Sequence, residues 1–223
     1  MNVERIDVRD GYDLWSPSYD ESLNCLVAMD RRVTLSWLAQ QPGERVLDAA
    51  CGTGAHLAEL VRRGSRPVGI DVSRGMLSVA RTKLPRVPLV QANLEAPLPL
   101  RPASLDGCLC ALVGEHIGRL GDLFAGLAAV IRPGGRLVFS TFHPELAAAG
   151  VEPNFERDGT EYRMKAAPHT LDDYFGAIRA AGFERIECAD YAGDEELVRE
   201  VPEARKYLGR ALLAVVRAWR KRR

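Results

Sequence analysis

The sequence predicts an α/β protein built on a doubly wound sheet of parallel strands. Between residues 44 and 142, short apolar segments alternate with segments whose apolar residues recur at helical spacing. Glycine or proline closes most of the helical segments. This alternation is typical of parallel strands joined by crossover helices, with helices on both faces of one sheet.

The elements follow in order along the chain. After an N-terminal stretch rich in aromatic residues, Glu21–Gln40 has helical periodicity and is stopped by Pro42 and Gly43. We expect strands at residues 44–50, 67–70, 87–91, 105–113 and 136–142. We expect the intervening helices at residues 55–63, 73–84 and 120–131, with a tight turn at residues 133–135.

The alternation breaks after His143. The polar segment from Pro144 to Pro168 contains a short alternating stretch and is expected to form a hairpin or flap inserted after the fifth strand. Beyond it we expect a helix at 170–181, strands at 183–191 and 211–219, and a surface connection or short helix at 193–203. The domain divisions follow from this order: one domain with N-terminal lid helices at 1–42, a ligand-binding core at 43–143, the insertion at 144–168 and the rest of the sheet at 169–223.

Composition limits the classes of function. Lys and Arg total 30, as do Asp and Glu, so the formal net charge is zero and no basic footprint of a nucleic-acid partner is present. The five cysteines follow no disulfide framework or zinc-knuckle spacing, which predicts reduced thiols in the cytoplasm and no metal site. Neither a secretory signal in residues 1–20 nor an apolar run long enough for a membrane span is found.

A ligand site is predicted where the first core strand ends. The strand ends at Asp48 and turns through Gly52 and Gly54 into a helix, so backbone N–H groups and space for close approach meet there. Asp71, at the end of the next strand, could accept hydrogen bonds from the ribose hydroxyls of an adenine nucleoside. Leu57 stands where the dinucleotide fingerprint requires its third glycine, which disfavours NAD.

Five segments then resemble, in order, the motifs of class I S-adenosylmethionine-dependent methyltransferases of the small-molecule type. They are VLDAACGTGAHLAEL, VGIDVSRGML, QANLEAPLPL, LDGCLCALVGEH and IRPGGRLVFSTF. The resemblance implies a seven-stranded sheet, mostly parallel with an antiparallel last strand, and S-adenosylmethionine as cofactor, with S-adenosylhomocysteine as product. It places Asp71 on the ribose, Met76 and Leu94 against the adenine and Asn93 at the adenine amino group. The implied cofactor residues are Asp48, Ala50, Gly52, Thr53, Gly54, His56, Asp71, Met76, Asn93, Leu94, Leu112 and Tyr19. For His56, a capping or packing role is an open alternative.

Other residues are candidates for the acceptor and the chemistry. Tyr12, Trp15 and Tyr19 resemble the lid of small-molecule methyltransferases, although they could equally anchor the first helix by packing. His116 and His143 follow the fourth and fifth strands and are candidate general bases. His169 and Tyr162 are candidate substrate contacts, and Glu115 could orient an amine.

We therefore expect methyl transfer to an oxygen or nitrogen atom of a small-molecule acceptor, mainly through proximity and orientation. The alternatives are a protein or RNA methyltransferase and a non-catalytic S-adenosylmethionine-binding protein. We expect the chain to act as a monomer or homodimer.

Overall fold

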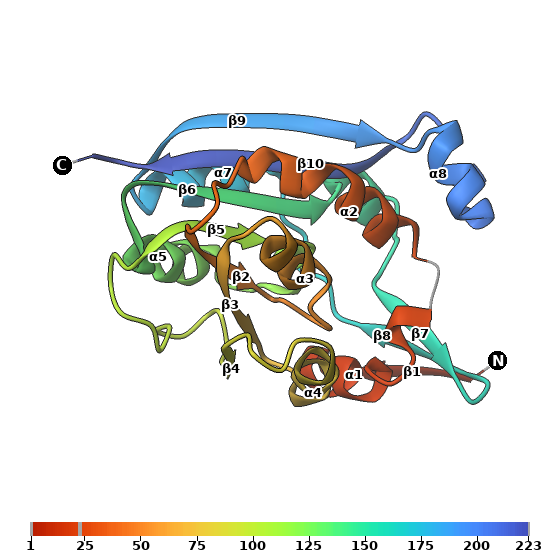
Figure 1. Ribbon diagram of the computed structural model, residues 1–223. Helices are drawn as coiled ribbons and strands as arrows, with labels where there is room; N and C mark the ends of the chain where they lie inside the picture. Colours follow the sequence, from red (N-terminus) through yellow and green to blue (C-terminus); the bar gives the residue numbers. More distant parts are fainter. Residues whose placement is uncertain (1, 22–23, 223) are drawn as a thin grey trace.

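The computed structural model describes residues 2–21 and 24–222. A seven-stranded sheet runs through the molecule, with the strand order β4-β3-β2-β5-β6-β10-β9 (Figure 1). Its strands are β2 Arg45–Ala49, β3 Arg66–Asp71, β4 Leu89–Gln91, β5 Leu105–Cys110, β6 Ile131–Phe142, β9 Phe183–Ala192 and β10 Ala211–Arg220. The strands β2 to β6 pair in parallel, and β10 runs antiparallel between β6 and β9. The expected seven-stranded α/β sheet with an antiparallel last strand is confirmed.

Helices cover both faces of this sheet. The α-helices are α1 Val8–Trp15, α2 Cys25–Leu38, α3 Ala55–Arg62, α4 Arg74–Lys83, α5 Leu120–Val130, α6 Pro144–Ala148, α7 Leu171–Ala180 and α8 Glu195–Glu200. Short 3₁₀ helices occur at η1 Tyr19–Glu21, η2 Gly114–His116 and η3 Pro202–Tyr207. The apolar residues of α5 and α7 form one core layer against the sheet, and those of α2 and α8 belong to another.

A second, three-stranded sheet lies beside the carboxyl ends of the main strands (Figure 1). The hairpin β7 Asn154–Arg157 and β8 Thr160–Met164 provides two strands, and β1 Asn2–Ile6 pairs in parallel with β8. The hairpin falls inside the insertion predicted after His143, and its role as a flap stays a prediction. The strand β1 was not predicted, because its five residues are largely exposed and polar and carry no pattern that requires a partner.

Several element boundaries differ from those predicted, and two of the differences have a clear physical reason. The long helix was predicted from Glu21, but Glu21 lies in η1 and α2 begins at Cys25; residues 22 and 23 lie outside the described residues. The Asn24 side chain accepts hydrogen bonds from the N–H groups of Leu26 and Val27, which caps the helix there. The predicted turn at residues 133–135 lies within β6, where the pairing with β5 shifts register.

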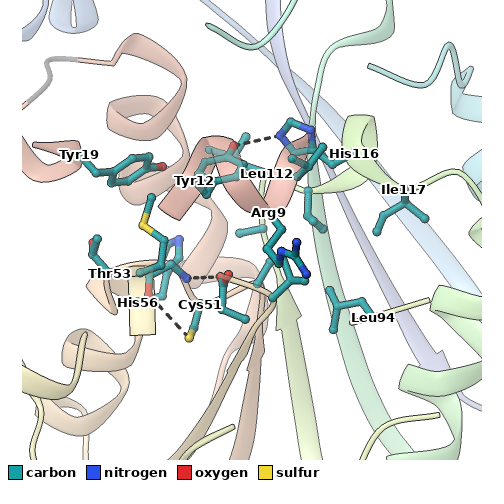
Figure 2. Close-up of a pocket in the computed structure, with 18 of the residues that line it drawn as sticks. Arg9, Tyr12, Tyr19, Cys51, Thr53, His56, Leu94, Leu112, His116 and Ile117 are labelled. Atoms are coloured by element: carbon teal, nitrogen blue, oxygen red, sulfur yellow. Dashed lines mark hydrogen bonds between the residues drawn. The ribbon is translucent and has the colours of Figure 1, made fainter. Parts of the chain in front are cut away.

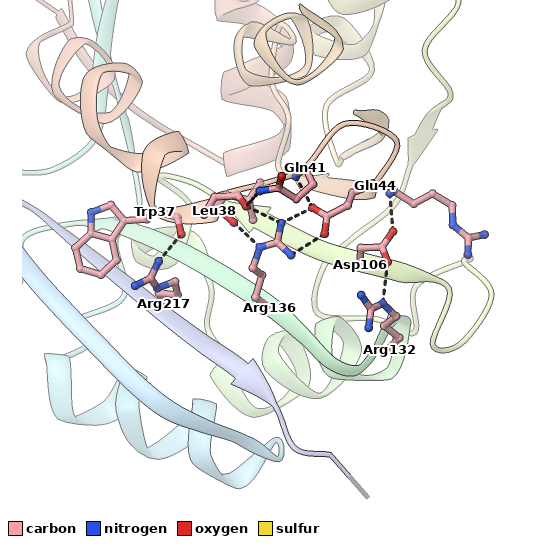
Figure 3. Close-up of polar contacts among 10 residues, drawn as sticks. Trp37, Leu38, Gln41, Glu44, Asp106, Arg132, Arg136 and Arg217 are labelled. Atoms are coloured by element: carbon pink, nitrogen blue, oxygen red, sulfur yellow. Dashed lines mark hydrogen bonds and ion pairs between the residues drawn. The ribbon is translucent and has the colours of Figure 1, made fainter. Parts of the chain in front are cut away.

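Charged side chains fix the amino ends of the strands, opposite the predicted site. The Arg136 guanidinium binds the Glu44 carboxylate and the carbonyls at the end of α2, so it joins β6, the start of β2 and α2 (Figure 3). Asp106 accepts hydrogen bonds from the Arg45 N–H and the Arg132 side chain. These contacts stabilise the edge of the sheet that is remote from the ligand side.

Candidate functional site

A cavity of about 290 Å³ opens where β2, β3 and β5 end. This is the edge at which open α/β sheets bind ligands. Figure 2 shows its wall formed by the turn after β2 on one side and by the N-terminal segment on the other. We call it the glycine-turn cavity. The predicted residues that line it are Ala50, Gly52, Thr53, His56, Asp71, Met76, Asn93, Leu94, Leu112, Tyr12, Tyr19 and His116.

The turn after β2 presents its backbone to this cavity. Ala50 and Gly52 have φ angles of 62° and 51°, in the left-handed region. A Cβ built on Gly52 would meet no heavy atom within 4 Å, so the space beside this glycine is open to a ligand. Gly54, with φ 86°, packs against Ala80 and does not line the cavity. The first glycine therefore gives access to the backbone, and the second makes room for α4.

Asp71 is held in place by the two turns that flank it. One carboxylate oxygen accepts a hydrogen bond from the Gly52 N–H at 2.8 Å, and the other accepts one from the Ser73 N–H at 2.9 Å. Burial raises the pKa of the Asp71 carboxyl, and these N–H groups oppose the rise. A nearly buried carboxylate with fixed orientation and spare lone pairs at a cavity suits a donor pair such as vicinal hydroxyls.

The far end of the cavity is suited to a flat, mainly apolar group with a polar edge. Met76 and Leu94 are almost completely buried and line it. The Asn93 side-chain oxygen accepts a hydrogen bond from the Glu95 N–H, which fixes the direction of the amide. These features fit the adenine end of a nucleoside.

The N-terminal segment closes the cavity from outside the sheet. The Tyr12 hydroxyl lies 2.9 Å from Nε2 of His116 (Figure 2). Burial raises the pKa of Tyr12 well above its usual range and that of Tyr19 to about 12, so both phenols stay protonated at neutral pH. The Nδ1 atom of His116 is buried without a hydrogen-bond partner among the described residues.

His56 joins two helices at the edge of the cavity. Its Nε2 lies 2.7 Å from a carboxylate oxygen of Asp30, and the other oxygen of Asp30 accepts hydrogen bonds from the Thr34 and Ser140 hydroxyls at 2.5 and 2.6 Å. Burial lowers the pKa of His56, but the hydrogen bond and charge of Asp30 outweigh it, and the net shift is upward. The ring thus lines the cavity and also ties α3 to α2.

Asp48 lies behind the cavity wall. It is 2% exposed and absent from the lining, and burial raises its pKa to about 7. One of its carboxylate oxygens is buried without a hydrogen-bond partner among the described residues. An ionised acid in this environment destabilises the folded protein. Groups with such a shifted pKa are often found at functional sites.

Four other predicted residues lie away from this cavity. His143 caps α6, with Nδ1 accepting from the Glu145 N–H and Nε2 3.5 Å from Asp190. The Nε2 of His169 lies 2.6 Å from the Ile117 carbonyl oxygen. The Trp15 and Tyr162 rings both stack on Phe155. Their proposed contacts with substrate stay predictions.

Sequence reasoning missed several lining residues, among them Arg9, Val27, Asp30, Glu95 and Ile117. Arg9 and Val27 come from the segment before β2, which reaches the site only through tertiary packing. Asp30 carried a signal, since an acidic residue on the buried face of a predicted helix requires a partner.

A second cavity of about 470 Å³ adjoins the first. We call it the aromatic cavity, because Trp15, Phe142, Phe155 and Tyr207 line it. Tyr12, Tyr19, Val27 and Leu112 line both cavities and form the boundary between them.

In residues 2–21 and 24–222, no group of three or more His, Cys, Asp or Glu side chains is arranged to hold a metal ion. Over the same residues, no helix has the length and apolar character needed to cross a membrane.

Comparison with known proteins gives a consistent family. Residues 47–139 match the family described as a methyltransferase domain. The chain is 30% identical over 224 residues to an uncharacterised methyltransferase of Emericella nidulans, with 82% of this chain and 78% of that protein covered. It is 38% identical over 141 residues to the demethylmenaquinone methyltransferase of Corynebacterium kroppenstedtii, with 62% of this chain and 57% of that protein covered. The match spans 34% to 65% of the length of several other curated relatives.

A solved structure supports the fold. The S-adenosylmethionine-dependent methyltransferase of Mesorhizobium loti superposes with a TM-score of 0.72 at 22% identity, covering 90% of this chain and 99% of that one.

Proposed function

This chain belongs to the family of class I S-adenosylmethionine-dependent methyltransferases, and from that premise we propose that it methylates an oxygen or nitrogen atom of a small-molecule acceptor. S-adenosylmethionine is the cofactor of the family. The observation that carries the proposal is the meeting of two cavities at one boundary. The glycine-turn cavity has the features of a nucleoside site, and the aromatic cavity has room for an organic acceptor.

The residues of the glycine-turn cavity fit the cofactor. Asp71 would hold the ribose hydroxyls, Asn93 the adenine edge, and Met76 and Leu94 the ring. The backbone of Gly52 and the protonated Tyr19 would flank the methionine part. When bound, the cofactor would supply an electrophilic methyl carbon on a positively charged sulfur. A lone pair of the acceptor would form the new bond to this carbon, and the electron pair of the broken C–S bond would stay on sulfur.

The chain's main contribution is orientation. Alignment of two bound groups can lower the activation barrier of a reaction by about 7–11 kcal/mol. Tyr12 and Leu112 border both cavities, so they would restrict the acceptor to approach along one line. A hydroxyl or ammonium acceptor releases a proton, which we assign to the Tyr12–His116 pair. In this pair the protonated Tyr12 phenol lies at the boundary of the two cavities and contacts Nε2 of the His116 imidazole.

A binding measurement tests the cofactor assignment. We expect S-adenosylmethionine and S-adenosylhomocysteine, but not NAD, to raise the melting temperature of the protein, because binding to the native state stabilises it by mass action. Asp71→Asn keeps the shape of the side chain and removes its charge. We expect it to weaken S-adenosylhomocysteine about 10- to 100-fold, the range for a hydrogen bond to a charged group.

Asp122→Asn serves as the matched control, because Asp122 is an exposed residue paired with Arg119 on α5. No thermal shift with either sulfur nucleoside would refute the proposed function. Equal affinities of the wild type and Asp71→Asn would refute the role given to Asp71.

A further inference from the structure

Glu115 is a buried carboxylate that has no ion-pair partner in the described part of the chain. The residue is 8% exposed, and one of its carboxylate oxygens is buried without a hydrogen-bond partner among the described residues. The backbone fixes the position of Glu115. The residue lies in η2, and its carbonyl oxygen accepts a hydrogen bond from the Ala167 N–H at 2.7 Å. An unpaired buried carboxylate is costly, and its persistence indicates that a ligand supplies the partner.

This carboxylate lines the aromatic cavity, close to the boundary with the glycine-turn cavity. Its sequence neighbour His116 and the boundary residue Tyr12 form the hydrogen-bonded pair described above. A group bound to Glu115 would therefore lie near the position at which the methyl group is transferred.

The other charged residues that line the aromatic cavity also favour a positively charged ligand. Among the described residues that line the aromatic cavity, four are glutamates and one is a lysine. Glu152 is already paired with Arg5, and Glu156 lies on the exposed side of β7, next to Phe155. The net charge of the wall is negative, so it disfavours a carboxylate or phosphate ligand and favours a cation.

The aromatic rings give the cavity an apolar wall. Trp15 and Phe155 are stacked with ring centroids 4.9 Å apart, and Trp15 also contacts Tyr19 edge to face at 4.8 Å. Phe155 also stacks on Tyr162, and Trp15 on Tyr12, so the faces of both rings are covered by other rings. What these rings offer a ligand is apolar surface, which suits the apolar part of an organic amine.

We propose that the aromatic cavity is the acceptor site and that the acceptor is an apolar amine whose ammonium group binds the Glu115 carboxylate. The proposal rests on the proposed function for the identity of the reaction and adds the chemical class of the acceptor. In it Glu115 determines specificity, while Trp15 and Phe155 bind the apolar body.

Three probes that share a phenyl ring and a two-carbon linker test the preference for charge. They are 2-phenylethylamine, 2-phenylethanol and 3-phenylpropionate, titrated against the full chain by calorimetry or ligand-observed NMR, with and without saturating S-adenosylhomocysteine. We expect the amine to bind at least about tenfold more tightly than the alcohol, since a hydrogen bond to a charged partner is worth that much, and the acid to bind most weakly.

Variants then assign the preference to Glu115. Glu115→Gln should abolish the difference between amine and alcohol, while its melting temperature should be unchanged or higher, because a buried unpaired charge is removed. Glu184→Gln, the same change at an exposed position on β9, should keep the difference. Phe155→Leu should weaken the amine and the alcohol together.

The outcomes separate the two proposals. Equal binding of amine and alcohol by the wild type, or a preference that survives in Glu115→Gln, would overturn the amine assignment even when S-adenosylhomocysteine binds normally. Failure of S-adenosylhomocysteine to bind would overturn the proposed function, and the probe titrations without it would still report on Glu115.

Discussion

Asp48 shows at the scale of one residue what it costs to bury an acid behind the glycine-turn cavity. It lies on β2 directly under the glycine turn, and the surrounding apolar core excludes water from its carboxyl. Burial raises its pKa from 3.8 to about 7, with the nearby charge of His56 opposing the shift. An apolar residue at this position would be easier to bury. A purely structural role therefore does not explain why an acid that lowers the stability of the fold is present here.

This shift predicts a pH-dependent gain from removing the charge. The unfolded chain releases the Asp48 proton near pH 4, and the folded chain releases it near pH 7. The folded state therefore binds more protons between these values, and its stability falls as the pH rises through this range. We expect Asp48→Asn to raise the free energy of unfolding at pH 8 and to change it little near pH 4.

Chemical denaturation at several pH values measures the effect. Asp122→Asn, on the surface, should show no such trend. A gain for Asp48→Asn that is the same at pH 4 and pH 8 would contradict the raised pKa.

At the scale of elements, the N-terminal segment is fastened to the nucleoside side of the site. One oxygen of the Asp13 carboxylate accepts hydrogen bonds from the Ser73 hydroxyl at 2.6 Å and the Gly75 N–H at 2.7 Å, which joins α1 to the start of α4. Asp20 accepts hydrogen bonds from Thr53 and Lys83. These contacts place Tyr12 and Tyr19 over the cavity, whereas the sequence left a lid role and a packing role equally open for these aromatic residues.

We expect Asp13→Ala to loosen this segment. The change removes two hydrogen bonds at a helix N-terminus, where one such contact is worth about 1 kcal/mol. Backbone amides of residues 8–15 should exchange faster with solvent, and S-adenosylhomocysteine should bind several-fold more weakly, because part of the cavity wall moves.

Hydrogen exchange and calorimetry on the same samples check both effects. Glu4→Ala, on the exposed strand β1, is the control. Unchanged exchange over residues 8–15 would show that Asp13 does not hold the segment.

At the scale of the whole molecule, the two edges of the sheet have separate tasks. The carboxyl edge carries the cavities, whereas the amino edge carries the network around Arg136 and Glu44 (Figure 3). Arg136 is largely buried and contacts three elements, so its loss would leave the Glu44 carboxylate and two carbonyls short of a donor.

Arg136→Ala should therefore lower stability without changing the site. We expect the free energy of unfolding to fall by about 1–3 kcal/mol, the cost of leaving a partly buried group unpaired. The affinity for S-adenosylhomocysteine should stay within about twofold at a temperature where the variant is folded. Replacing the exposed Arg62, paired with Glu59 on α3, should cost less than about 1 kcal/mol. A large loss of ligand affinity in Arg136→Ala would show that the two edges are coupled.

The sequence by itself determined the sheet and its ligand edge. Strand and helix periodicities are local, and the glycine turn, Asp71 and Asn93 each follow a strand, so topology alone brings them to one edge. The local sequence also indicates where α2 starts, because Asn24 is a residue type that typically caps the N-terminus of a helix.

Tertiary structure alone decided what faces this edge. The strand β1 pairs with β8 across more than 150 residues of chain, and no local pattern encodes that pairing. The same long-range packing brought His169 to the Ile117 carbonyl and Tyr12 to His116, whereas His143 caps α6 through a local contact with Glu145. It also buried Glu115 with no ion-pair partner among residues 2–21 and 24–222, because burial and pairing depend on segments that meet only when the whole chain has folded.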